Sequence, residues 1–162
     1  MADTPDEAKV FAVDTRFQQM ARRPGGISRD KALAAAVQEI ENARPEVEDW
    51  LEREVQALAR AVAVGQRGGS ASEWLHIATR HCRQLRDVGT TMGLELLTYV
   101  TDELCDILDA SADSKKPLDM ETIVCYVEAA VLARQDVYRS MKPDQVPELI
   151  NGLRAVASRN KA

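Results

Sequence analysis

The chain has two histidines, His76 and His81, and both fall in one predicted helix. Histidine binds metals, acts as an acid or base, and accepts phosphoryl groups. Side chains five residues apart on a helix project about 140° from each other, at about 100° per residue. The two imidazoles therefore do not share a metal ion bound from one helical turn. We expect no metal site and no cofactor.

Nucleophilic catalysis is not indicated by the sequence. Cys82, Cys105 and Cys125 are widely spaced, with no Cys-x-x-Cys pair, and each lies in a helical segment. They are typical of small buried or half-buried thiols. His81 and Cys82 are neighbours in sequence, and neighbours on a helix do not face each other. The glycines at 65, 68 and 69 lack the lysine of a phosphate-binding loop. We therefore predict that the protein is not an enzyme.

The composition excludes two classes of partner. The formal net charge is −5, and the arginines are scattered among acidic residues, whereas nucleic-acid binding needs a concentrated basic face. No apolar run is long enough to span a bilayer, and Met1–Val10 lacks the apolar region of a signal peptide. We expect a cytoplasmic protein that binds neither nucleic acid nor membrane.

Glycine and proline divide the chain into a tail, residues 1–26, and a single helical domain, residues 27–162. Ser28 is a plausible N-cap for a long helix that extends to about residue 64. Its apolar stripe has three- and four-residue spacing and consists of Leu33, Val37, Ile40, Val47, Leu51, Val55, Leu58 and Val62. Pro45 removes a helical hydrogen bond, yet the stripe keeps its phase. The sequence therefore predicts either one kinked helix or two helices that share a face.

Further helices are predicted after this first one. Ser70 and Glu73 have the spacing of a capping box, and the helix they begin ends at Gly93. Residues 94–110 form the next helix, 111–118 a polar loop, and Asp119 caps a helix over residues 120–140. A last short helix follows Pro147. These segments predict an all-α fold, an antiparallel four-helix bundle with a long first helix and an extra C-terminal helix.

The segment around Gly93 resembles the core motif of histidine phosphotransfer (HPt) domains. In that family a helix carries His-x-x-Lys-Gly, reaches a glycine turn ten residues after the histidine, and is followed by an antiparallel helix with facing leucines. Alignment on Gly93 puts Arg83 in the histidine position, Arg86 in the lysine position and Asp87 in the position of the first glycine. The resemblance covers about fifteen residues and implies an HPt-like bundle whose phosphoacceptor is replaced.

A second resemblance covers more of the chain. Pro24-Gly25-Gly26-Ile27-Ser28 precedes a helix rich in alanine and glutamate, and it is followed later by Met92-Gly93-Leu94 and by Leu104-Cys105-Asp106-Ile107-Leu108. This order is similar to that of small alphaproteobacterial proteins of the CheE type, found among chemotaxis genes. The resemblance implies a non-catalytic partner of the chemotaxis phosphorelay.

Three hypotheses for function follow. The first is an interaction protein of bacterial two-component or chemotaxis signalling that binds a receiver or histidine-kinase domain through Arg83, Arg86 and Asp87. The second is an active phosphotransfer protein that uses His81, which lies two residues before the position of the family's histidine and is otherwise a partly buried structural residue. The third is a structural oligomer, in which the long first helix forms a homodimer.

Overall fold

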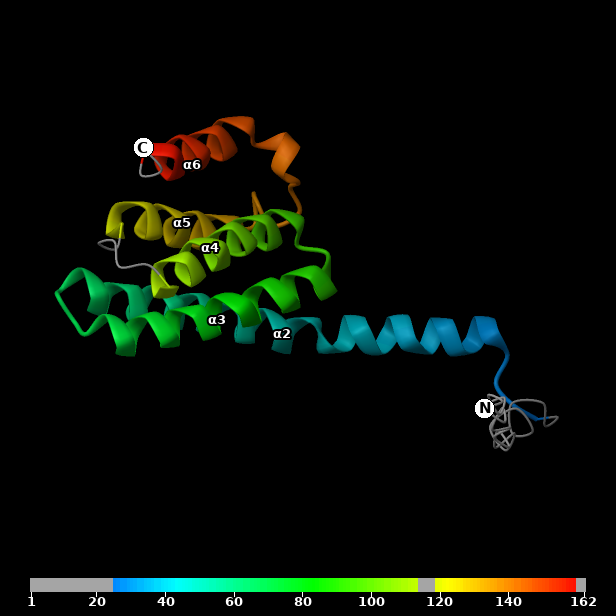
Figure 1. Cartoon of the computed structure of the whole chain (residues 1–162). Coiled ribbons are helices and arrows are strands. Elements are labelled where there is room, and N and C mark those ends of the chain that lie inside the picture. Colours follow the sequence, from blue (N-terminus) through cyan, green and yellow to red (C-terminus); the bar gives the residue numbers. More distant parts are fainter. Residues whose placement is uncertain (1–24, 114–118, 160–162) are drawn as a thin grey trace, which may run out of the picture. The chain divides into compact units, whose positions relative to one another are not determined.

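The computed structural model describes residues 25–113 and 119–159, and every regular element within these ranges is a helix (Figure 1). The elements are α2 (Arg29–Gln66), α3 (Ala71–Met92), α4 (Glu95–Asp113), α5 (Met120–Ala133), the short 3-10 helix η1 (Pro143–Gln145) and α6 (Pro147–Arg159). The prediction of an all-helical fold is confirmed. Residues 1–24 of the predicted tail and residues 114–118 of the predicted loop lie outside the described residues.

The contacts divide the chain at Pro45 into two compact units, residues 1–44 and residues 45–162. The first unit contains the beginning of α2, where Ser28 acts as the predicted N-cap. Its Oγ accepts a hydrogen bond from the backbone N–H of Lys31 at 3.4 Å. The side chains of Leu33, Val37 and Ile40 are all exposed. The apolar stripe of α2 is therefore exposed over these turns.

The second unit contains the hydrophobic core. The later turns of α2 contribute Leu51, Val55, Leu58 and Val62, which are all buried. The core is almost entirely aliphatic, and its large aromatic members are Trp74 and Tyr126. Helix α4 packs against both α3 and α5, and α5 packs against α6. Successive helices are thus joined through one continuous apolar interior.

Helix α5 begins where the sequence predicted but ends earlier. The carboxylate of Asp119 accepts a hydrogen bond from the N–H of Thr122, so this N-cap is confirmed. The α-helix stops at Ala133 instead of residue 140, and turns follow. Arg134 donates from its guanidinium to the backbone oxygen of Glu48 at 3.1 Å. This contact with α2 holds the chain where the helix was expected to continue, and Val137 is exposed.

The start of α3 differs from the predicted capping box. The side chain of Ser70 makes no capping hydrogen bond, and its hydroxyl instead lies 2.9 Å from that of Ser72. The backbone oxygen of Ser70 accepts hydrogen bonds from the N–H groups of Glu73 and Trp74. The helix therefore begins at the predicted place, but the backbone oxygen of Ser70 provides the hydrogen bonds there. The Ser70 hydroxyl does not cap the helix, because it pairs with that of Ser72.

Within the described ranges, no helix combines the length and the apolar character needed to cross a membrane.

Candidate functional site

The hairpin of α3 and α4 positions the residues that the sequence analysis singled out. Gly93 has φ = +70°, in the left-handed region that favours glycine, and ends α3. The N–H of Leu94 donates to the carbonyl of Gly89 at 2.9 Å, which completes a typical glycine C-cap. The chain therefore reverses at the predicted glycine, and α4 returns along α3.

The two helices approach closely along their seam. A Cβ atom built on Gly89 would lie 2.8 Å from the Oγ1 of Thr98, so a larger residue there would force the threonine side chain to shift. Further along, the Sγ atoms of Cys82 and Cys105 lie 3.2 Å apart, and the Cys82 thiol donates to the carbonyl of Thr101. The hydrogen bond with Cys105, together with burial, raises the pKa of Cys82. The buried seam therefore supports the residues on the outer face of the hairpin.

Five charged side chains span the outer face of this hairpin, and we call them the hairpin charge face: Arg83, Arg86, Asp87, Asp102 and Asp109. The guanidinium of Arg83 forms two hydrogen bonds to the carboxylate of Asp109, at 2.8 and 2.9 Å. Arg86 lies 3.1 Å from Asp87 and 3.6 Å from Asp102. The face thus consists of ion pairs, most of which bridge α3 and α4.

The hairpin charge face is open to solvent. The Arg83 side chain is 53% exposed and that of Asp109 is 46% exposed. Asp109 raises the pKa of the Arg83 guanidinium through their hydrogen bonds. Exposed ion pairs of this kind contribute little to stability, because water screens them. A partner with its own carboxylates or phosphate could therefore displace these contacts at small cost.

His81 lies away from this seam, on the side of α3 that faces α2. Its Nδ1 atom is 2.5 Å from a carboxylate oxygen of Glu54, and its side chain is 12% exposed. Its Nε2 atom is 3.4 Å from the guanidinium of Arg80. Both ring nitrogens thus have a neighbour, and the imidazole links α2 to α3. The arrangement fixes the orientation of the ring.

His76 is exposed, and Glu73 stands three residues before it, a spacing found in helical metal sites. Such sites need further ligands from other helices. The described part of the chain contains no group of three or more histidine, cysteine or acidic residues that could hold a metal ion. This pair therefore gives no metal centre among the described residues.

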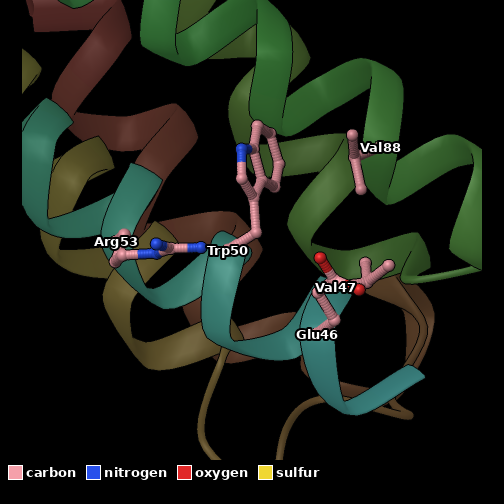
Figure 2. A pocket seen from close by; sticks show the side chains of 5 residues that line it. All are labelled: Glu46, Val47, Trp50, Arg53 and Val88. Carbon is pink, nitrogen blue, oxygen red and sulfur yellow. The ribbon is translucent and has the colours of Figure 1, made fainter. Parts of the chain in front are cut away.

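Several hollows lie elsewhere on the second unit. The first, of about 260 Å³, is between α2 and α3, and is lined by Glu46, Val47, Trp50, Arg53 and Val88. Figure 2 shows Trp50 projecting from α2 beside Val88 of α3. The second, of about 520 Å³, lies between α5 and α6 and is mainly aliphatic. Its lining also includes the thiol of Cys125 and the carboxylates of Glu128 and Glu148.

Sequence reasoning placed Arg83, Arg86 and Asp87 near the turn but did not identify their partners. Arg83 and Asp87 are exposed, whereas Arg86 is half-buried. Sequence reasoning missed three acidic residues because their partners lie on other helices: Asp102, Asp109 and Glu54. For Glu54 a signal existed: it is among the few carboxylates on the α2 face that carries the apolar stripe.

No protein-family model, curated protein or solved structure matches this chain.

Proposed function

We propose that the protein is a non-catalytic interaction protein of bacterial two-component or chemotaxis signalling, which binds a receiver or histidine-kinase domain through the hairpin charge face. In this proposal the described helices act as an HPt-like antiparallel bundle. The observation that carries it is the exposed Arg83 on α3, ten residues before the glycine turn, in the position where an HPt domain has its phosphoacceptor histidine.

The chemistry of this face suits recognition more than catalysis. An arginine accepts no phosphoryl group from a phosphoaspartate at neutral pH, because its guanidinium stays protonated. It does bind carboxylates and phosphates through paired hydrogen bonds. A receiver domain presents such groups around its phosphorylated aspartate, so Arg83 and Arg86 would contact the same region that a phosphoacceptor histidine approaches.

The test is binding of the full chain to a panel of receiver domains and histidine kinases, with and without receiver phosphorylation. The variant Arg83→Glu/Arg86→Glu should lose affinity by at least about tenfold, because each reversal replaces an attraction with a repulsion. Arg60→Glu/Arg67→Glu is a matched control, since it reverses two exposed arginines elsewhere in the second unit. Equal affinity of both variants would exclude the hairpin charge face as the binding surface.

A second candidate function is phosphotransfer through His81. The contact that favours it is the one between Nδ1 and Glu54, because the carboxylate engages Nδ1 and leaves Nε2, 3.4 Å from the guanidinium of Arg80, as the nitrogen that would accept the phosphoryl group. In this hypothesis a phosphorylated receiver should label the protein, and the label should be acid-labile. His81→Gln should abolish the label and His76→Gln should retain it. An unlabelled wild-type protein would rule out the phosphotransfer hypothesis.

A further inference from the structure

The first turns of α2 carry an apolar face that the described residues leave uncovered. We call Leu33, Val37 and Ile40 the outer stripe. Their side chains are 53%, 59% and 56% exposed, respectively. Spacings of four and three residues put all three on one face of the helix. Three large aliphatic side chains therefore share one exposed face over two turns.

An uncovered face of this kind is unusual because a helix depends on packing for most of its stability. The part of α2 before Pro45 has sixteen residues, Arg29–Arg44, and an isolated helix of about 12–15 residues is only marginally stable in water. The ion pair between Arg44 and Glu41 lies within this segment and joins residues only three apart. Burial of the outer stripe against a partner would supply the missing packing.

We infer that a second copy of this chain covers the outer stripe, with the two α2 helices antiparallel. The stripe is nearly self-complementary, since Val37 lies four residues after Leu33 and three before Ile40. A two-fold axis near Val37 would place Leu33 of one protomer against Ile40 of its partner. Such isologous two-fold contacts are the commonest form of homo-oligomer.

Charge favours the antiparallel orientation. Beside the outer stripe, Arg29 and Asp30 lie at one end of the segment and Glu41 and Arg44 at the other end, whereas Lys31 and Glu39 project from the opposite face. A parallel pair would align like charges along both ends. An antiparallel pair brings Asp30 of each protomer towards Arg44 of its partner, and it also opposes the two helix dipoles.

The size of the contact sets the expected affinity. Sixteen residues of helix are about 24 Å long, and two such segments bury less than the roughly 1,200–2,000 Å² of a standard stable interface. The dimer should therefore be weak and reversible, with a Kd in the micromolar range. This inference concerns the first unit alone and does not depend on receiver binding by the hairpin charge face.

Sedimentation equilibrium of the full chain from about 1 to about 300 μM, a range that brackets a micromolar Kd, should show a monomer–dimer equilibrium. Val37→Glu places two carboxylates near the two-fold axis and should raise the Kd at least about tenfold. Ala35→Glu is the matched control, because it adds the same charge on the opposite face of the same helix, about 160° away from Val37. Its Kd should stay within about twofold of wild type.

Both residues are exposed, so neither substitution should disturb the core, which circular dichroism checks. A wild-type monomer at every concentration would overturn the inference, since the outer stripe would then be covered by another part of the chain or by another protein. A dimer that Val37→Glu leaves unchanged would also overturn it, because the contact would lie on another face.

Orientation is tested by disulfide trapping of two single variants in a Cys125→Ser background. When Leu33→Cys and Ile40→Cys are mixed and oxidised with copper–phenanthroline, an antiparallel pair should give the mixed disulfide. A parallel pair would give disulfides between identical variants. Predominance of the identical pairs would refute the antiparallel arrangement.

Discussion

Gly65 offers a sharp test of how α2 packs on α3. A Cβ atom built on Gly65 would lie 2.5 Å from Cε2 of Trp74 and 2.8 Å from its Cδ2 and Nε1 atoms. Carbon atoms in contact are normally about 3.5–4.0 Å apart, so the indole would have to move by about 1 Å. Trp74 is only 2% exposed, and its burial leaves the ring little room for that movement.

Two opposing effects determine the stability of Gly65→Ala. Replacing glycine by alanine inside a helix favours folding by up to about 1 kcal/mol. Overpacking of a well-filled core costs about 1–3 kcal/mol. Gly65 is next to the last residue of α2, so the helical gain is reduced there. We expect a net loss of about 1–2 kcal/mol in the free energy of unfolding.

Gly152→Ala is the matched control, because Gly152 lies inside α6 and a Cβ atom built on it would have nothing within 4 Å. The same chemical change should stabilise the protein there, by up to about 1 kcal/mol. Urea denaturation followed by circular dichroism and tryptophan fluorescence measures both variants. If Gly65→Ala is as stable as Gly152→Ala, then Trp74 does not pack against Gly65 and the contact described between α2 and α3 is wrong.

Three further outcomes are expected. Asp119→Ala should lower the free energy of unfolding by about 1 kcal/mol because α5 loses the acceptor for the N–H of Thr122, and Asp119→Ser should recover most of it in the same urea titration. Burial raises the pKa of Tyr126 to about 12, so ultraviolet difference spectra should show its phenolate only near that pH. The folded state should lose stability as pH rises from about 10 towards 12, because the unfolded chain releases this proton more readily. A Tyr126→Phe variant that still shows the late phenolate would contradict this. In native protein a maleimide should modify the half-buried Cys125 and spare the two buried thiols, whereas all three should react in denaturant, as mass spectrometry would reveal.

Local signals were sufficient to predict several elements of this fold. Gly93 marked the turn between α3 and α4, since a residue with positive φ is most easily glycine. Asp119 marked the start of α5, because its carboxylate satisfies a helix N–H that would otherwise be unpaired. Apolar residues along α3 recur at three- and four-residue spacing, and the face that they form, which contains Leu75, Cys82 and Leu85, is buried. Each of these features is encoded within a few residues.

The tertiary structure decided what local periodicity could not. One apolar stripe runs along α2 with a constant pattern, yet Leu33 and Val37 are exposed while Leu51 and Val55 are buried. The pattern reports which face of a helix is apolar, and only the neighbouring helices determine whether that face is covered. The early end of α5 has the same origin, because the contact of Arg134 with Glu48 joins residues 86 positions apart in sequence.

The candidate site follows the same division. The sequence by itself placed Arg83 ten residues before a glycine turn, on a helix whose opposite face is apolar, and so determined that it would face solvent. Its pairing with Asp109, and that of His81 with Glu54, were decided only when the helices packed, over separations of 26 and 27 residues. Ion pairs between helices depend on the relative position of two surfaces, and hydrophobic spacing within each helix does not specify which charged side chains will meet.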